Sequence, residues 1–263
     1  MEIRSSADFV LMTRAALAAA GFVRNEIDGT VYFTAGSGDP LVLVHGVNDQ
    51  AGSWFTVAPA LARSYRVIIP DLPGHGESEP KEGPLPIPLM VERLHGVVRA
   101  SGAPSIILTG NSLGGWIAIL YTLAHPERVS RLVLEAAGGL ARPLASPIIA
   151  RDRGEALIIL RNVHGPHYQP QEWVIDALLQ RASASPMLRV TAMTEHFIDA
   201  RLGEIAVAAS IVWGADDGVV PRSYAEALQQ GIRNAKLHVI EGAAHIPHLQ
   251  QPERFLACLT STS

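Results

Sequence analysis

Short runs of apolar residues alternate with longer stretches of helical periodicity along most of the chain. Eight runs are predicted to be strands: 22–27, 31–33, 41–44, 66–69, 105–109, 131–135, 210–213 and 237–240. Continuous apolar runs are typical of strands buried on both faces of a parallel sheet. Because strands and helices alternate, we predict an α/β fold with a mostly parallel eight-stranded sheet and helices on both of its faces.

The stretches between these runs supply the predicted helices, at 7–20, 53–62, 90–100, 113–124, 223–230 and 252–259. Asp28-Gly29 separates the first two strands and is a hairpin-turn signal. The first two strands are therefore expected to form a hairpin.

One segment, residues 142–203, lies between the sixth and seventh predicted strands and has no convincing strand pattern of its own. Helical patterns cover 147–162, 170–182 and 186–202. Ligands of open α/β folds bind at the carboxyl edge of the sheet. We therefore expect a helical cap at 142–203, inserted over that edge between the two parts of the core, 1–141 and 204–263.

Composition narrows the class of protein. The chain has 263 residues, 48% of them hydrophobic and 17% charged, and a net charge of −4 without a basic run, so no nucleic-acid partner is expected. The single cysteine, Cys258, excludes an intramolecular disulfide and a cysteine-built metal site. No apolar run is long enough for a membrane span, and Asp8 and Arg14 interrupt the apolar N-terminal stretch, so a cytoplasmic protein is expected. No pattern predicts an oligomeric state.

A candidate nucleophile stands in the pattern Gly-x-Ser-x-Gly at residues 110–114, directly after a predicted strand and before a predicted helix. The glycines permit a sharp turn where bulkier residues would collide with the strand and helix. The turn lifts the hydroxyl of Ser112 clear of the backbone. It also places Ser112 at a helix N-terminus, where developing negative charge is favoured.

Five motifs together resemble the signature set of the α/β-hydrolase superfamily, in its capped serine esterase and C–C hydrolase branch. They are Val44-His45-Gly46, the string Asp-Leu-Pro-Gly-His-Gly-Glu-Ser at 71–78, Gly-Asn-Ser-Leu-Gly-Gly at 110–115, Trp-Gly-Ala-Asp-Asp at 213–217 and Gly-Ala-Ala-His at 242–245. The resemblance covers about residues 31–259 and is weak inside the expected cap. It implies the α/β-hydrolase fold and the chain order Ser, Asp, His for a catalytic triad.

The resemblance assigns the base to His245 and the orienting acid to Asp217, the fifth residue of the Trp-Gly-x-x-Asp string. A histidine suits the removal of a serine proton near neutral pH. Two rivals remain. His248 lies three residues further on and is expected to pack or cap its loop. Asp216 is expected to be a solvated turn residue. By the same resemblance, Asp71 is a structural turn residue.

Acyl transfer needs donors for the negative charge that develops on the carbonyl oxygen. The backbone N–H of Leu113, the residue after the nucleophile, is expected to be one donor. The N–H of Val47, in the loop after strand 41–44, is the candidate for the other. His45 is expected to anchor this loop. A polar tip follows at 48–50, which either touches substrate or is solvated.

Apolar and aromatic residues in and near the cap are candidates for an apolar pocket. Those expected to contact the substrate are Trp54, Leu140, Trp173 and Ile246. Most of the cap's apolar side chains could instead form the core of the cap. His164, His167 and Tyr168 lack metal-ligand spacing with a carboxylate, so neither a metal nor another cofactor is expected.

Three functions remain open. The first is a serine hydrolase that cleaves a small carboxylic ester through an acyl-enzyme. The second is a C–C bond hydrolase of ring-fission products, although Ile246 stands where those enzymes usually carry tryptophan. The third is a ligand-sensing protein on the hydrolase scaffold, whose mark would be a broken triad. Acyl transfer to an alcohol cannot be separated from hydrolysis by residues alone.

Overall fold

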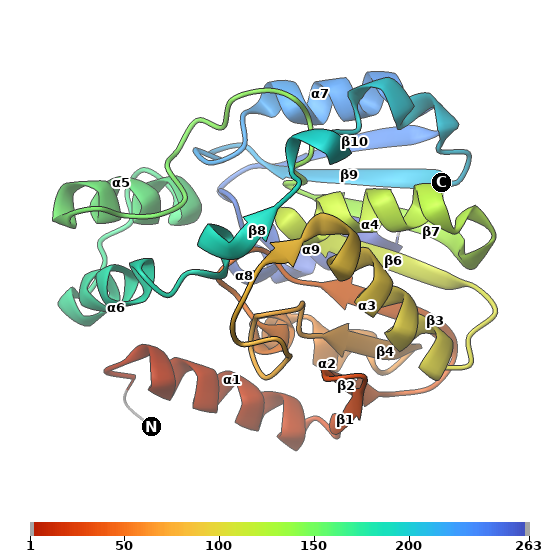
Figure 1. Cartoon of the computed structure of the whole chain (residues 1–263), viewed down its shortest axis with the longest axis horizontal. Coiled ribbons are helices and arrows are strands. Elements are labelled where there is room, and N and C mark those ends of the chain that lie inside the picture. The colour runs from red at the N-terminus through yellow and green to blue at the C-terminus, as the bar shows by residue number, and fades with distance from the viewer. Residues whose placement is uncertain (1–2, 261–263) are drawn as a thin grey trace.

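A computed structural model describes residues 3–260 and contains an eight-stranded sheet (Figure 1). The strands, in the spatial order β1-β2-β4-β3-β6-β7-β9-β10, are Val23–Ile27, Thr30–Ala35, Tyr65–Pro70, Asp39–Val44, Ile106–Asn111, Val129–Glu135, Ala208–Gly214 and Ala235–Ile240. β2 is antiparallel to both of its neighbours, and the remaining pairs are parallel. The predicted sheet and the hairpin at Asp28-Gly29 are confirmed.

The register of the central strands brings their carboxyl ends to one edge. Val44 of β3 pairs with Gly110 of β6, and Glu135 of β7 pairs with both Asn111 of β6 and Val212 of β9. Every residue of β6 is buried, as the continuous apolar run predicted. The loops after these strands therefore start side by side, although they are far apart in the sequence.

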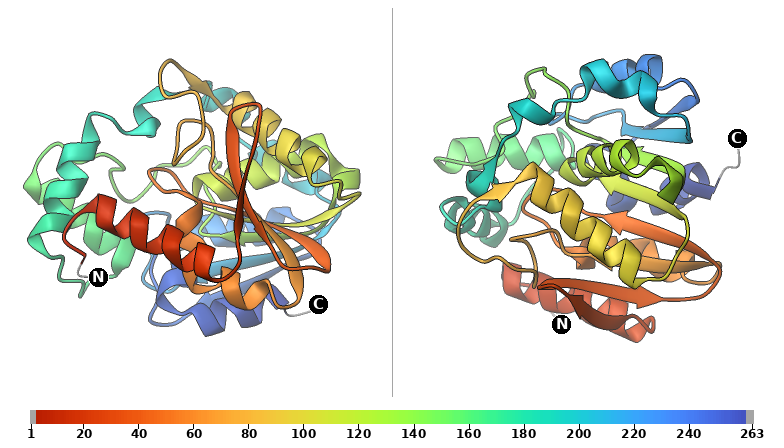
Figure 2. Two further views of the ribbon diagram at one scale, coloured as in Figure 1. Left: turned by 90° about the horizontal axis from the view of Figure 1, so that it is seen from below. Right: turned by 45° about the vertical axis from the view of Figure 1, so that its right-hand side comes forward.

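Helices cover both faces of the sheet (Figure 2). Side chains alternate between the faces along β3, so that Val42 and Val44 join one core cluster while Leu41 and Leu43 join the other. The first cluster includes residues of α3 (Ile87–Ala100), α4 (Leu113–Ala124) and α7 (Arg222–Gly231). The second includes residues of α1 (Ser6–Ala19), α2 (Ala58–Leu61) and α9 (Pro252–Thr260).

Residues 136–207, which we call the β7–β9 connection, contain two helices at one end of the molecule (Figure 1). α5 (Arg153–His164) and α6 (Glu172–Ala182) pack together around a small apolar cluster of their own. Asp152 caps α5 by accepting a hydrogen bond from the N–H of Glu155 at 2.9 Å. The two helices predicted here end within two residues of their expected last residues.

The helix predicted over 186–202 is wrong. The segment consists of the 3₁₀ turns η3 (Pro186–Arg189), η4 (Thr194–His196) and η5 (Asp199–Glu204), together with the two-residue strand β8 (Val190–Thr191). β8 pairs with β5 (Leu85–Pro86). The guanidinium of Arg189 donates 2.7 Å hydrogen bonds to the carbonyls of Pro80, Lys81 and Gly83, and these long-range contacts hold the start of the segment against the chain that precedes β5.

The helix predicted over 53–62 is instead the 3₁₀ helix η1 (Ala51–Thr56) followed by the short α2. Pro59 lies in the first turn of α2, where it has no N–H to bond the carbonyl four residues earlier, so one continuous helix does not run through 53–62. The short helix α8 (Pro247–Gln250) precedes α9.

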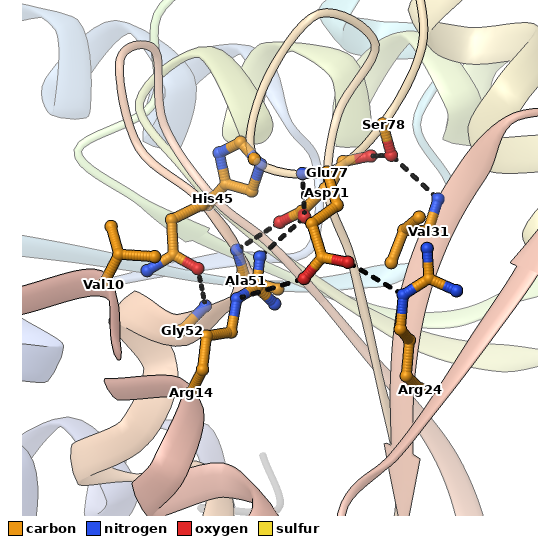
Figure 3. A network of polar contacts seen from close by, with 12 residues as sticks. Val10, Arg14, Arg24, Val31, His45, Ala51, Gly52, Asp71, Glu77 and Ser78 are labelled. Carbon is orange, nitrogen blue, oxygen red and sulfur yellow. Dashed lines mark hydrogen bonds and ion pairs between the residues drawn. The ribbon is translucent and has the colours of Figure 1, made fainter. Parts of the chain in front are cut away.

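Helix α1 is fixed to the core through a buried carboxylate (Figure 3). Asp71, which is fully buried, accepts a 2.7 Å hydrogen bond from the guanidinium of Arg14 on α1. It also accepts hydrogen bonds from the N–H groups of Ala51 at 2.6 Å and Glu77 at 2.8 Å. Asp71 thus ties together α1, η1 and the loop after β4, and all of its carboxylate contacts are structural.

Candidate active site

The turn between β6 and α4 carries Ser112 in a strained backbone conformation, with φ of 53° and ψ of −115°. Such a conformation costs a non-glycine residue on the order of 1–3 kcal/mol. The flanking glycines make the turn possible. A Cβ on Gly110 would lie 2.3 Å from the carbonyl oxygen of Gly114, and one on Gly114 would lie 2.4 Å from that of His45. The turn therefore has the expected strand–turn–helix form.

A histidine and a carboxylate from two further loops meet beside this turn. The Nδ1 of His245 lies 3.0 Å from Oδ2 of Asp217. Both side chains are almost fully buried, at 8% and 1% exposure respectively. Asp217 Oδ1 also accepts hydrogen bonds from the N–H groups of Val219 at 2.8 Å and Val220 at 3.0 Å. A carboxylate fixed in this way orients the imidazole and leaves its Nε2 free to accept a proton. The neighbouring Asp216 is exposed.

The backbone of His245 is held on both sides. Its N–H donates to the carbonyl of Val163 in α5 at 3.1 Å. Its carbonyl accepts a 3.1 Å hydrogen bond from Nδ2 of Asn111, the residue before Ser112. Gln250 adds a bridge, because its Oε1 accepts from the N–H of Ala244 and its Nε2 donates to the carbonyl of His164, both at 2.7 Å. The imidazole is thus attached both to the serine turn and to the β7–β9 connection.

Asn111 and Gln250 were not predicted to contact the loop that carries His245. Asn111 stands at a variable position of its motif, and Gln250 precedes a proline in a polar run that indicated a helix start. No local pattern predicts the bond of Asn111 to His245 or that of Gln250 to His164, because these partners lie far away in the sequence.

His248 lies away from this site, in a buried pair with Glu135. The carboxylate of Glu135 accepts 2.7 Å hydrogen bonds from the backbone N–H and from Nδ1 of His248. Both side chains are at most 1% exposed. The ring of His248 also packs against that of Trp54, with ring centroids 4.2 Å apart. The sequence contained one signal for this pair: Glu135 is a charged residue at the end of a buried apolar strand, where it needs a polar partner.

The loop after β3 faces the serine turn. His45 is fully buried, and its Nε2 accepts a 3.0 Å hydrogen bond from the N–H of Leu72 while its Nδ1 donates to the carbonyl of Gly46. These bonds use both ring nitrogens for anchoring. Beyond Val47, Asn48 has a positive φ of 60° and accepts a 2.6 Å hydrogen bond from the hydroxyl of Ser185. The loop tip is therefore tied to the β7–β9 connection.

A cavity of about 430 Å³ opens over these groups. Its lining includes Ser112, His245, Val47 and Leu113, so the side chains and backbone positions predicted for the site surround one space. Most of its other walls are apolar side chains, among them Trp116.

Comparison with known proteins identifies the family of this chain. A family model described as "Alpha/beta hydrolase family" matches residues 41–257, which is most of the chain. The chain belongs to the alpha/beta hydrolase family. A 2-hydroxy-6-oxononadienedioate/2-hydroxy-6-oxononatrienedioate hydrolase of Paraburkholderia xenovorans is 30% identical over an alignment of 265 positions. The alignment covers 89% of this hydrolase and 91% of the relative.

Two solved structures have the same fold as this hydrolase. The 2-hydroxy-6-oxo-6-phenylhexa-2,4-dienoate hydrolase of Rhodococcus sp. strain RHA1 superposes with a TM-score of 0.78 at 22% identity, over 90% of this chain and 97% of that one. The carboxylesterase CesB of Bacillus subtilis superposes with a TM-score of 0.75 at 19% identity, over 96% and 99%. At these identities the likeness shows the fold and leaves the substrate open.

The structure separates the four residues that were predicted to contact substrate in this hydrolase. Leu140 and Ile246 line the cavity that holds Ser112. Trp54 does not, because its fully buried ring packs against the rings of His248 and Phe255. Trp173 lines a neighbouring cavity between α1 and α6.

Two further observations concern this hydrolase as a whole. Within residues 3–260, no helix combines the length and apolar character that crossing a membrane requires. Over the same described range, no three His, Cys, Asp or Glu side chains are grouped so that they could hold a metal ion.

Proposed function

We propose that this chain is a serine hydrolase that cleaves a small carboxylic ester through an acyl-enzyme on Ser112. One observation carries the proposal: His245, whose Nδ1 lies 3.0 Å from the carboxylate of Asp217, lines the same cavity as Ser112. A serine hydroxyl is a weak nucleophile until a base removes its proton. An imidazole oriented by a buried carboxylate is the arrangement that does so near neutral pH.

In the first step, Ser112 Oγ attacks the ester carbonyl carbon while His245 Nε2 takes the hydroxyl proton. The resulting imidazolium is stabilised by the carboxylate of Asp217. His245 then gives this proton to the oxygen of the departing alcohol, and the carbon–oxygen bond of the ester breaks. Water attacks the acyl-enzyme in the second step, with His245 again removing a proton and returning it to Ser112.

The negative charge on the carbonyl oxygen would be met by the N–H groups of Val47 and Leu113. Both residues line the cavity, and Leu113 is the first residue of α4, where a helix leaves its N–H groups unpaired. Loss of one such donor typically lowers the rate by about 100- to 1,000-fold. The partial positive charge of the α4 N-terminus acts in the same direction.

Residues 142–203 would act as the cap that closes this site. α5 contributes Leu160 and Val163 to the cavity wall, and Met187 and Met193 come from the segment that follows α6. A mostly apolar lid of this kind excludes water and binds the apolar parts of a substrate.

A C–C bond hydrolase is the second candidate, and the relatives favour it. Besides the Paraburkholderia xenovorans enzyme, a 2-hydroxy-6-oxo-6-phenylhexa-2,4-dienoate hydrolase of Burkholderia cepacia is 28% identical over 249 residues. The same triad would serve, because both reactions end with water attacking a carbonyl carbon. The ester reaction is preferred because Ile246 occupies the position at which those enzymes usually carry tryptophan.

Two experiments test these proposals. A fluorophosphonate should add one covalent adduct to the protein, located on Ser112 by peptide mass spectrometry and absent from Ser112→Ala. An adduct elsewhere, or none, would remove the serine hydrolase proposal. Assays of p-nitrophenyl butyrate beside a vinylogous 1,5-diketone acid separate the two reactions, since turnover of the diketone alone would favour the C–C hydrolase.

A further inference from the structure

A second cavity, of about 440 Å³, lies between α1 and the helices α5 and α6. Figure 1 and the left-hand view of Figure 2 place the N-terminal end of α1 beside α6. Ile3 and Ser6 line this cavity from the N-terminal segment, and Trp173, Val174 and Ala177 line it from α6. We call it the outer cavity, and the one that holds Ser112 the inner cavity.

The outer and inner cavities adjoin along a shared wall. Six residues line both of them: Phe9, Asn48, Ile148, Leu160, His164 and Leu178. Asn48 directly follows Val47 of the proposed oxyanion loop, so the shared wall starts beside the reacting carbonyl. The two cavities are therefore direct neighbours along the side chains of this wall.

The walls favour an uncharged, apolar occupant. Most side chains around the outer cavity are aliphatic or aromatic, and the charged one among its described lining residues is Arg181, which is exposed. Within the shared wall, His164 is neutral at pH 7 because burial and the nearby His245 lower its pKa to about 4. A charged group against the shared wall would lose its hydration without gaining a partner of opposite charge there.

Helix α1 is a fixed part of this wall. Phe9 packs edge-on against Phe55 of η1, with ring centroids 6.4 Å apart. One turn and a half further on, Arg14 forms the buried ion pair with Asp71. The hydroxyl of Ser185, bonded to Asn48, ties the opposite side of the outer cavity to the loop after β3. Three separate parts of the chain therefore hold the outer cavity in place.

We propose that the outer cavity binds the distal end of the substrate's own apolar chain, and that the substrate is an ester with a long uncharged alkyl or arylalkyl group. The reacting carbonyl lies in the inner cavity at Ser112, and the chain passes along the shared wall toward Trp173. This inference rests on the proposed ester hydrolysis at Ser112 and extends its substrate from a small ester to one whose chain is long enough to reach the outer cavity.

A chain-length series tests the inference on the wild-type protein. One arm uses p-nitrophenyl acetate, butyrate, octanoate and dodecanoate, and the other uses acetates of ethanol, butanol, octanol and dodecanol followed by titration of released acid. Each methylene that enters an apolar site improves binding by roughly fourfold. In one of the two arms, kcat/KM should rise by at least about 100-fold from the ester with the two-carbon chain to the ester with the eight-carbon chain. The arm that rises identifies the side of the ester that occupies the outer cavity.

A matched pair of α6 variants tests the location. Ala177 lines the outer cavity but not the inner one, whereas Gln180 is exposed on the same helix and lines neither. Ala177→Trp should lower the ratio of kcat/KM for the octyl ester to that for the shortest ester by at least about tenfold. Gln180→Trp should leave the ratio unchanged. If part of a sample is unfolded, the apparent kcat/KM values for both esters fall by the same factor, so their ratio does not depend on the folded fraction.

The outcomes separate this inference from the proposed function. Hydrolysis of short esters without a rise in either arm, or an unchanged ratio in Ala177→Trp, would overturn the inference and leave the ester hydrolase intact. Absence of any ester hydrolysis, together with no fluorophosphonate adduct on Ser112, would overturn both.

Discussion

The backbone N–H of His245 donates a 3.1 Å hydrogen bond to the carbonyl of Val163, in the last turn of α5. The carbonyls on either side are used in the same way: that of Asn162 accepts from the N–H of Gly218 at 3.1 Å, and that of His164 accepts from Gln250. A helix normally leaves its last carbonyls unpaired. Here they bind the loops of the proposed base and acid.

Gln250 is the side chain through which this attachment can be tested. Gln250→Leu removes both of its 2.7 Å hydrogen bonds, one to the Ala244 N–H and one to the His164 carbonyl. A small displacement of a catalytic group can cost about 100-fold in rate. We expect kcat for ester hydrolysis to fall by about 10- to 100-fold with little change in KM, measured by steady-state kinetics.

Gln251→Leu provides the control for Gln250→Leu. Its amide donates a longer, exposed hydrogen bond of 3.3 Å to the carbonyl of Gly242, outside the site. We expect kcat close to that of the wild type. Equal kcat values in the two leucine variants would show that the Gln250 bridge does not position the base.

Asp217 and Asp216 form a second matched pair. Asp217→Asn keeps the size of the side chain but removes the acceptor charge that holds the imidazole tautomer, which in serine hydrolases lowers kcat by about 10,000-fold. The exposed Asp216→Asn should change kcat by less than about twofold. Steady-state kinetics of both variants decides the acid, and a larger loss in Asp216→Asn would reverse the assignment.

The buried pair of Glu135 and His248 should affect stability rather than chemistry. His248→Leu leaves the Glu135 carboxylate buried without its ring partner, and removing one partner of such a pair costs about 3–5 kcal/mol. We expect a loss of that order in the free energy of unfolding by urea. The protein that remains folded should still react with fluorophosphonate at Ser112. Loss of this reaction with stability intact would instead make His248 the base.

The stability of the fold should fall in acid partly through His164. Burial is the largest cause that lowers its pKa from 6.5 to about 4. Between these values the unfolded chain binds a proton that the folded chain does not, so folding loses stability as the pH falls from about 6.5 to about 4. Above this window His164 is neutral in both states and contributes nothing.

We therefore expect His164→Gln to lose less unfolding free energy than the wild type between pH 7 and pH 5, measured by urea titrations at both values. The exposed His167→Gln, in the loop after α5, is the control and should keep the wild-type pH dependence. An identical pH dependence in His164→Gln and the wild type would contradict the assigned burial effect.

The elements that depend on local physics were predictable. Helix α4 has the predicted bounds, Leu113–Ala124, because a continuous apolar run follows the glycine-rich turn directly. The eight sheet strands were each located, since apolar runs of strand length between turn residues have few other stable arrangements. The positions of the serine turn and of the loops that carry Asp217 and His245 followed from the same pattern and from the family motifs.

Long-range contacts account for what the sequence could not predict. Periodicity alone favoured a helix over 186–202, but the bonds of Arg189 to three distant carbonyls and the pairing of β8 with β5 hold the start of that segment, and short 3₁₀ turns form instead. Trp54 fitted an aromatic pocket residue by type, yet its place was decided by the ring of His248. Neither partner can be read from the neighbouring residues.

The sequence by itself determined the order of elements, the strained serine turn and the side chains available for the chemistry, because each depends on residues that are close together in the chain. Only the tertiary structure decided that the end of α5 holds the loops of Asp217 and His245, that Glu135 pairs with His248, and that α1 joins α6 around a second cavity. These relationships depend on how distant segments pack against one another. Many pairings of segments are compatible with the same local pattern, but the native pairing gives the buried polar groups their hydrogen-bond partners.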